Sequence, residues 1–229
     1  MESVLHARPP AHVSLYVTRF PALAALLLAS SLAAADSLPL PALLKAVENR
    51  YNHAQSLQLA FTQTYSGGRR PVQSESGTLY LRKPGRMRWD YASPAGKLFL
   101  ADGKNVFEYT PGDDQAFKRQ LAASDDLRAP LAFLLGHLEF AKEFRGVRSR
   151  TANNAIWIEA DAKTDNLAYT KAEFQVEPSG EIRRVVITGQ DLSKLDFAFS
   201  GEKLNPQVAA DLFVFHAPRG VEVMEEKGR

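Results

Sequence analysis

The stretch from Ser76 to Pro111 constrains the fold most strongly, because it alternates apolar runs with residues that favour tight turns. Its four short runs are rich in Leu, Tyr, Phe, Val and Trp. The segments between them are Lys83-Pro84-Gly85, Ser93-Pro94-Ala95-Gly96 and Asp102-Gly103. Turn signals between apolar runs are typical of β-hairpins. The stretch therefore predicts an antiparallel meander of four strands.

One run within this meander has two unlike faces. Met87, Trp89 and Tyr91 alternate with charged residues, and alternate residues of a strand point to opposite sides of a sheet. A sheet with one large apolar face either covers a core or lines a cavity. The choice between these two decides the functional class.

The first 35 residues have the pattern of a cleaved secretory signal. Two arginines precede the apolar run Pro21–Leu32, and Ala33–Ala35 supply the small residues that a signal peptidase needs. The run is shorter than the roughly 20 apolar residues of a membrane-spanning helix, although an N-terminal membrane anchor is the alternative. We therefore expect residues 1–35 to be removed and the protein to be exported.

Residues 36–229 are expected to form a single domain with a sizeable core and no interdomain linker. Without Glu2, Arg8 and Arg19 of the signal, the net charge of +2 falls to +1, which favours no charged partner. We expect no nucleic-acid binding and interpret the basic cluster in the first half as a solvated sheet face. The chain has no cysteine, which excludes disulfides and thiolate chemistry.

Helical spacing marks the segment after the signal, and alternation marks most of the later segments. Apolar side chains recur at helical spacing from Ser37 to His53, with prolines near the start, where proline is tolerated. The other expected strands are 57–63, 115–121, 156–160, 169–177, 181–189, 195–199 and 212–216, with a turn at Pro178-Ser179-Gly180 and one helical turn at 206–210. The sum is a mainly β fold of about ten strands that curls on itself, covered by two or three short helices.

The segment from Ser124 to His137 interrupts the β pattern. Ser124-Asp125-Asp126 has the composition of a helix cap, and the apolar residues after it predict a short helix ending at Gly136, with Pro130 inside it. So much apolar surface on so short a helix requires a partner surface.

No catalytic or metal-binding pattern stands out. The sequence has no nucleophile elbow, no glycine-rich phosphate loop and no two histidines at metal-ligand spacing. Asp113-Asp114 and Asp125-Asp126 lie beside turn or cap signals, so we interpret them as structural; a small secreted hydrolase that uses these acids is a weaker alternative. We expect a protein that is not an enzyme, has no cofactor and no metal, and functions through shape and apolar surface.

Several short motifs, spread from Leu43 to Val223, resemble those of one known family. They are Leu59-Ala60-Phe61-Thr62-Gln63, Gly77–Leu81 with Lys83-Pro84, Met87-Arg88-Trp89, Leu98–Leu100 with Ala101-Asp102-Gly103-Lys104, Tyr109, Pro111, Phe213-Val214-Phe215 and Pro218-Arg219-Gly220-Val221. In these residues the chain resembles the LolA family, the periplasmic carriers of outer-membrane lipoproteins.

This resemblance implies an open, incomplete antiparallel β-barrel that helices close around an apolar cavity for the acyl chains of a lipoprotein. An inner-membrane ABC-type lipoprotein release complex would load the carrier, and an outer-membrane lipoprotein receptor of similar fold would receive the cargo. The carrier would be a monomer in the periplasm. The physical chemistry agrees, because each buried CH₂ contributes about 0.8 kcal/mol and acyl chains are therefore costly to expose to water.

The resemblance also implies roles for individual residues. The cavity wall would contain Leu59, Phe61, Met87, Trp89, Leu98 and Leu100, and the lid helix would contain Leu131, Phe133 and Leu134. Lys83 stands where the family has an arginine that latches the lid; lysine lacks the planar fork of arginine, and Arg82 is the possible substitute. Ordinary core packing is the alternative for each of these residues.

A second hypothesis is a lipid-sensing or lipoprotein-sensing regulatory protein of the same fold in an envelope-stress pathway. Such sensors usually carry a second, C-terminal domain. The sequence after the last motif is short, which favours the carrier.

Overall fold

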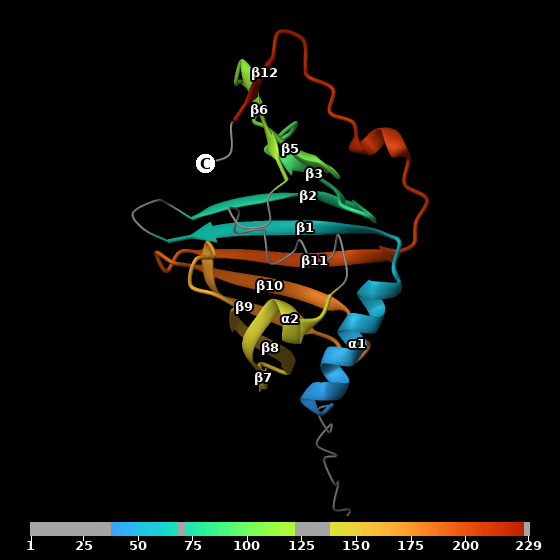
Figure 1. Ribbon diagram of the computed structural model, residues 1–229, viewed down its shortest axis with the longest axis vertical. Helices are drawn as coiled ribbons and strands as arrows, with labels where there is room; N and C mark the ends of the chain where they lie inside the picture. The colour runs from blue at the N-terminus through green and yellow to red at the C-terminus, as the bar shows by residue number, and fades with distance from the viewer. Residues whose placement is uncertain (1–37, 68–71, 122–137, 227–229) are drawn as a thin grey trace, which may run out of the picture. The chain divides into compact units, whose positions relative to one another are not determined.

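The residues that the structure describes form one open sheet and a few short helices. The structure is a computed structural model that describes residues 38–67, 72–121 and 138–226, and Figure 1 shows its elements. Within these ranges the helices are α1 (Leu40–His53), the single-turn α2 (Phe140–Glu143) and the 3-10 helix η2 (Ala210–Phe213). The strands are β1 (Ser56–Ser66), β2 (Gln73–Arg82), β3 (Arg86–Ser93), β4 (Leu98–Asp102), β5 (Asn105–Tyr109), β6 (Gln115–Gln120), β7 (Phe144–Ala152), β8 (Ala155–Ala162), β9 (Tyr169–Val176), β10 (Ile182–Gly189), β11 (Lys194–Leu204) and β12 (Glu222–Glu225).

All twelve strands of the described residues belong to a single sheet whose two edges do not pair. Their order is β12-β6-β5-β4-β3-β2-β1-β11-β10-β9-β8-β7, and neighbours are antiparallel except β12 and β6. The pairing of β1 with β11 joins the half that contains β2 to β6 to the half that contains β7 to β10 (Figure 1). The expectation of an open antiparallel sheet is confirmed, with two strands more than the expected ten or so.

One face of the sheet is apolar along several strands, and we term it the inner face. The register of β1 to β4 aligns Leu59, Leu79, Trp89 and Phe99. Directly opposed residues of neighbouring strands point to the same side, and these four side chains are at most 7% exposed. The same apolar cluster continues across β1 to Phe197 of β11. The core of the described protein therefore lies on the inner face.

Helix α1 packs against this core through apolar residues that recur every four positions. Leu43, Val47 and Tyr51 are its buried residues. The Tyr51 hydroxyl donates to Glu202 Oε2 at 2.7 Å and accepts from the Ile182 amide at 2.9 Å, which ties the helix to β10 and β11. Burial, and then the negative charge of Glu202, raise the pKa of Tyr51. The hydroxyl therefore remains protonated and able to donate.

A second set of hydrogen bonds ties α1 to the segment that contains α2. The Asn52 side chain exchanges two hydrogen bonds with the backbone of Leu138, at 2.8 and 2.7 Å, and Glu48 Oε1 accepts from the Phe140 amide at 2.9 Å. The Phe140 ring in turn meets the Phe174 ring of β9 edge-on, with centroids 5.5 Å apart. Helix α2 thus extends the inner-face core toward β9.

The outer face of β3 to β5 is crossed by residues 206–215, which we term the C-terminal segment. Arg88 Nη1 donates to the Leu212 carbonyl oxygen at 3.2 Å. The Phe215 ring stacks on the Phe107 ring of β5, with centroids 4.9 Å apart. Beyond this segment the chain adds β12 in parallel beside β6.

The sequence predicted helix α1 and ten of the strands. The expected meander is β2 to β5, and the expected hairpin is β9–β10. The prediction of a strand at 212–216 is wrong, because the helical turn lies at Ala210–Phe213 and residues 214–216 belong to no strand. Strands β7 and β12 were not anticipated. The expected signal at 1–35 and lid helix at 124–137 lie outside the described residues.

Candidate functional site

An aromatic cluster occupies the centre of the inner face. The Phe61 ring meets Trp89 edge-on at 4.6 Å between centroids and Tyr91 at 5.1 Å, and Trp89 lies 5.1 Å from Phe197. Gly77 stands opposite both Phe61 and Tyr91 in the register, so the two rings meet over a position without a side chain. Each such aromatic pair contributes about 0.5–1.5 kcal/mol beyond its burial. The cluster is therefore a well-packed apolar surface.

Four of the expected wall residues come together on this face. Leu59, Phe61, Met87 and Trp89 are at most 3% exposed and belong to one apolar cluster. The Trp89 indole N–H donates to Met87 Sδ at 2.8 Å, and a thioether is a weak, adaptable acceptor. These four residues thus share one apolar face, and their contact with a cargo remains a prediction.

Leu98 and Leu100 lie on the other face of the sheet, contrary to expectation. Trp89 stands opposite Phe99 in the register of β3 and β4, so the odd-numbered residues of β4 share the inner face. Leu98 and Leu100 therefore point to the outer face, where Leu100 is fully buried. Placing them in the same wall as Trp89 is a mistake that the register corrects.

The two residues expected to latch a lid contact other parts of the chain. Lys83 Nζ donates to the carbonyl oxygens of Tyr51 at 2.7 Å and Asn52 at 3.5 Å, in the last turn of α1. Burial lowers the pKa of Lys83, and a cation at this position complements the helix dipole. Arg82 Nη1 donates to the Val208 carbonyl oxygen at 3.4 Å. Because the lid segment lies outside the described residues, the latch role remains a prediction.

Away from α1, the inner face of β1 to β3 carries a polar group that we term the polar row: Tyr91, Gln63, Glu75 and Lys97. The Tyr91 hydroxyl donates to Gln63 Oε1 at 3.1 Å, and Gln63 Nε2 donates to Glu75 Oε2 at 3.2 Å. Lys97 Nζ donates to both Glu75 oxygens, at 2.6 and 2.7 Å, and lies 4.7 Å from the centre of the Tyr91 ring. Sequence reasoning missed this group, because only the register brings its members together; Gln63 of the Phe-Thr-Gln motif was the one signal in the sequence.

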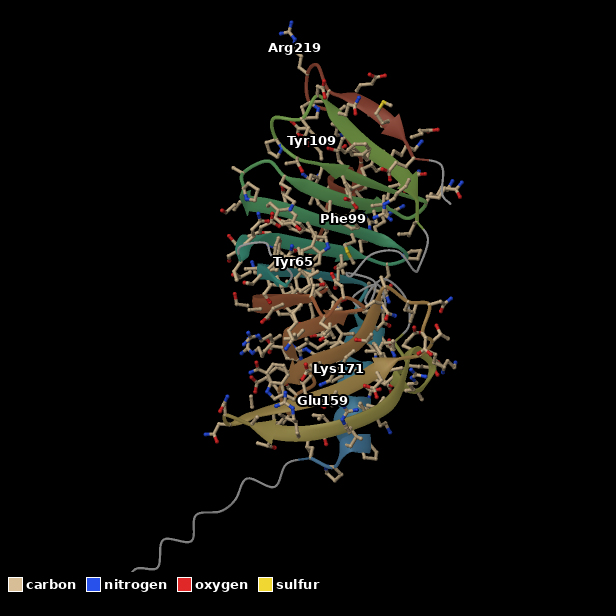
Figure 2. All side chains as sticks on the ribbon, turned by 90° about the vertical axis from the view of Figure 1, so that its left-hand side faces the viewer. Tyr65, Phe99, Tyr109, Glu159, Lys171 and Arg219 are labelled. Atoms are coloured by element: carbon tan, nitrogen blue, oxygen red, sulfur yellow. The ribbon has the colours of Figure 1, made fainter. Side chains whose placement is uncertain are left out.

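The outer face of β7 to β9 carries a network of charges, in which Figure 2 labels Glu159 and Lys171. Glu159 accepts a hydrogen bond from Arg150 and lies 2.8 Å from Arg148 Nη2. Lys171 Nζ lies 3.4 Å from Glu159 and 3.2 Å from Glu173. The hydrogen bond from Arg150 lowers the pKa of Glu159 against the opposing effect of burial, and the charge of Lys171 adds to the lowering. The outer face of these strands is thus charged, whereas their inner face is apolar.

Histidines and acids give no second candidate site in the described part of the chain. His53 Nδ1 lies 2.7 Å from the Asn49 carbonyl oxygen, and His216 Nε2 lies 3.3 Å from Asp211 Oδ1. Across residues 38–67, 72–121 and 138–226, no group of three or more such side chains is placed to hold a metal ion. No helix within these ranges is long and apolar enough to cross a membrane.

Comparison with known proteins matches most of the chain to one family. Residues 52–216 match the family model described as outer membrane lipoprotein carrier protein LolA. An outer-membrane lipoprotein carrier protein from Nitrosospira multiformis is 29% identical over 175 residues, which are 76% of this chain and 84% of the relative. A protein of the same name from Dechloromonas aromatica is 27% identical over 194 residues, 82% of this chain and 92% of the relative. Among solved structures, a LolA superfamily protein from Nitrosomonas europaea has a TM-score of 0.45 at 11% identity, with 78% of this chain and 99% of that one covered.

Proposed function

Because the chain belongs to the LolA family of outer-membrane lipoprotein carrier proteins, we propose that it binds the acyl chains of lipoproteins on its inner face and carries them through the periplasm. The observation that carries this proposal is the continuous apolar inner face of a sheet that does not close. Each methylene group moved out of water contributes about 0.8 kcal/mol, so a triacylated protein does not diffuse freely through water. Carrying acyl chains through the periplasm requires an apolar surface on the protein comparable in extent to those chains. It requires no chemical reaction.

Within this proposal an inner-membrane ABC-type release complex loads the carrier, and an outer-membrane lipoprotein receptor unloads it. The carrier acts as a monomer after residues 1–35 have been removed. Leu59, Phe61, Met87 and Trp89 contact the acyl chains, and the apolar segment that contains Leu131, Phe133 and Leu134 covers them. The names of the relatives support a role in carrying lipoproteins. The loading complex, the receptor and the covering segment are parts of our proposal.

The two tryptophans of the chain provide a test, because they lie on opposite faces. Trp89 belongs to the inner-face cluster, whereas the Trp157 ring of β8 lies 5.1 Å from the Arg150 guanidinium on the outer face. Bromine quenches indole fluorescence only at close range. In Trp157→Phe, a synthetic triacylated lipopeptide with brominated chains should therefore quench Trp89.

The matched control is Trp89→Phe, in which Trp157 is the remaining tryptophan. Co-elution of the lipopeptide in gel filtration establishes binding to both variants, and the Trp157 fluorescence should then stay unchanged. Quenching of Trp157, or binding without quenching of Trp89, would place the lipid away from the inner face. Failure of the unaltered protein to bind the lipopeptide would overturn the carrier function.

The natural cargo is identified by native mass spectrometry of the protein purified from its own periplasm, followed by lipid extraction. A one-to-one complex with an acylated protein is the expected result. Free phospholipid alone, or no ligand, would instead favour the lipid-sensing regulatory protein, and a membrane protein partner would be the next object of search.

A further inference from the structure

The inner face of β1 to β4 changes from apolar to polar along the strands. The register sorts its side chains into rows that run across the strands. The row beside the end of α1 contains Leu57, Leu81, Met87 and Ala101, the second contains Leu59, Leu79, Trp89 and Phe99, and the third contains Phe61, Gly77 and Tyr91. The polar row comes next, with the Tyr91 hydroxyl already part of it. The inner face of β1 to β4 is therefore apolar at the end beside α1 and polar at the opposite end.

The two ends of this gradient differ in their access to water. Leu57, Leu81 and Met87 are at most 3% exposed, and a pocket of about 10 Å³ between α1 and Leu57 holds one water at most. At the other end, the Glu75 and Lys97 side chains are 17% and 28% exposed. The apolar end is closed by α1, and the polar end reaches solvent.

We infer that the polar row receives the ester and amide carbonyl groups at the head of an acylated cargo, while the acyl chains lie along the strands and point toward the end of α1. This inference rests on the proposed function and adds the orientation of the cargo. An ammonium group has three N–H donors and a side-chain amide has two, so Lys97 and Gln63 can each donate to a carbonyl oxygen of the head. The reverse orientation places those carbonyls against Leu57 and Leu81, which offer no donor.

The length of the apolar rows agrees with this orientation. At about 3.3 Å per residue, the distance along β1 is about 13 Å from Leu57 to Phe61 and about 20 Å from Leu57 to Gln63. One leaflet of a bilayer with a hydrocarbon core of about 30 Å accommodates chains about 15 Å deep. An acyl chain whose head lies at the polar row therefore ends between the second row and the row beside α1.

The absence of cysteine from the chain allows a single nitroxide label to be placed at either end. Ser93 lies at the end of β3 near the polar row, Gln55 lies just after α1, and both are exposed. Ser93→Cys and Gln55→Cys are each labelled and mixed with a triacylated lipopeptide that carries a trifluoromethyl group either at the end of an acyl chain or beside the head. The label at position 93 should broaden the fluorine signal of the head more, and the label at position 55 that of the chain end.

The possible outcomes separate the orientation from the proposed function. The reverse pattern, or equal broadening from both positions, would overturn the orientation while leaving lipid binding intact. A lipopeptide that does not bind the unlabelled protein would overturn the proposed function and the orientation with it.

A paired substitution tests the chemistry of the polar row. In Glu75→Gln/Lys97→Met the charges are lost with little change in size, and we expect lipopeptide affinity to fall about tenfold, as for loss of a hydrogen bond from a charged donor. The matched control is Glu177→Gln/Arg183→Met beside the β9–β10 turn, which removes the ion pairs of Arg183 with Glu177 at 3.3 Å and with Glu181 at 2.8 Å. Urea unfolding of both variants separates binding from stability. An equal change in affinity in the two variants would contradict a role of the polar row.

Discussion

Gly180 is a position where the backbone leaves no room for a side chain. Its φ of +82° is unfavourable for other residues, and a Cβ atom there would lie 2.4 Å from the Ala46 carbonyl oxygen. The turn that the sequence predicted between β9 and β10 thus also forms the contact between that hairpin and α1. A single missing side chain determines how closely the helix approaches the sheet.

Gly180→Ala should therefore lower the free energy of unfolding by roughly 2–4 kcal/mol, because the strain of a left-handed residue, about 1–2 kcal/mol, adds to the backbone clash. Urea unfolding followed by circular dichroism measures the loss. Gly112→Ala is the matched control: its φ is +94°, but no atom lies within 4 Å of the added Cβ, so it should show the strain alone. Equal losses in the two variants would mean that α1 moves away at little cost.

At the same scale, the sequence separated the faces of β3 but not those of β4. In β3 apolar residues alternate with Arg86, Arg88 and Asp90, so the faces differ in chemistry. In β4 both faces are apolar, because Phe99 and Ala101 alternate with Leu98 and Leu100. Alternation then contains no information, and only the pairing with β3 assigns the faces.

Among the elements, β7 shows why a strand can escape detection. Its sequence, FRGVRSRTA, has few apolar residues and no alternation. Charges bind it to β8 and β9 instead, through Arg148 and Arg150 with Glu159 at the centre. Ion pairs across strands depend on register, which sequence patterns do not report.

Glu159 should make the stability of this part of the sheet depend on pH. Its folded-state pKa is lower than the ordinary 4.5, so its contribution is present above about pH 4.5 and is lost as the pH falls through the folded-state pKa. Glu159→Gln should be less stable than the unaltered protein at pH 7, by about 1–3 kcal/mol, and the difference should shrink in acid. Urea unfolding of the unaltered protein and of Glu159→Gln between pH 7 and 3 measures this difference and its decrease.

The control for this prediction is Glu225→Gln, which removes the pair of Glu225 with Lys118, 2.6 Å apart, in which the Glu225 side chain is 72% exposed. The hydrogen bond from Lys118 lowers the pKa of Glu225 as well, but exposed pairs contribute little to stability, so this variant should stay close to the unaltered protein across the pH range. A pH-independent difference between Glu159→Gln and the unaltered protein would contradict the lowered pKa of Glu159.

The C-terminal segment is the other element that pattern reasoning misjudged. Residues 212–216, LFVFH, have aromatic and aliphatic side chains at successive positions, which resembles a buried strand. In the structure their aromatic side chains find partners without a β ladder: Phe213 is buried, and Phe215 stacks on Phe107.

A double-mutant cycle on Phe107→Ala and Phe215→Ala should give a coupling energy of about 0.5–1.5 kcal/mol in thermal or urea unfolding. Either single variant already removes the stacking contact, so the double variant loses less than the sum of the two single losses. Phe107→Ala with Val214→Ala is the control cycle, since Val214 is 47% exposed, and its coupling should be close to zero. Additive losses for the two phenylalanines would show that the stack does not hold the segment in solution.

For the whole molecule, the inner face exists only in the folded state, because most strands contribute to it. A ligand that binds the folded state alone stabilises it by about 2.7 kcal/mol at one hundred times its dissociation constant. We therefore expect a triacylated lipopeptide at that concentration to raise the free energy of unfolding by this amount, measured in urea. The same peptide without acyl chains should have no effect; an equal effect would place recognition in the peptide.

The sequence predicted local order at this scale but not the global arrangement. Each hairpin follows from a turn between apolar runs, as at Asp102-Gly103 and Pro178-Ser179-Gly180. The pairing of β1 with β11 follows from no local signal, since what favours it is the match of distant apolar residues such as Phe61 and Phe199. The polar row could not be predicted from the sequence either, because only the register of the strands brings its members together.

The pairing of β1 with β11 also has a kinetic consequence. Its strands are Ser56–Ser66 and Lys194–Leu204, so most of the chain lies between them, whereas the other antiparallel neighbours are consecutive along the sequence. Contacts between distant segments form slowly, because a long loop must close first. Each half of the sheet therefore forms early from its own hairpins, and β1 and β11 are free edges until the halves meet. During that interval a second chain competes for the same backbone groups. A newly made molecule is therefore most prone to aggregation before β1 and β11 have paired.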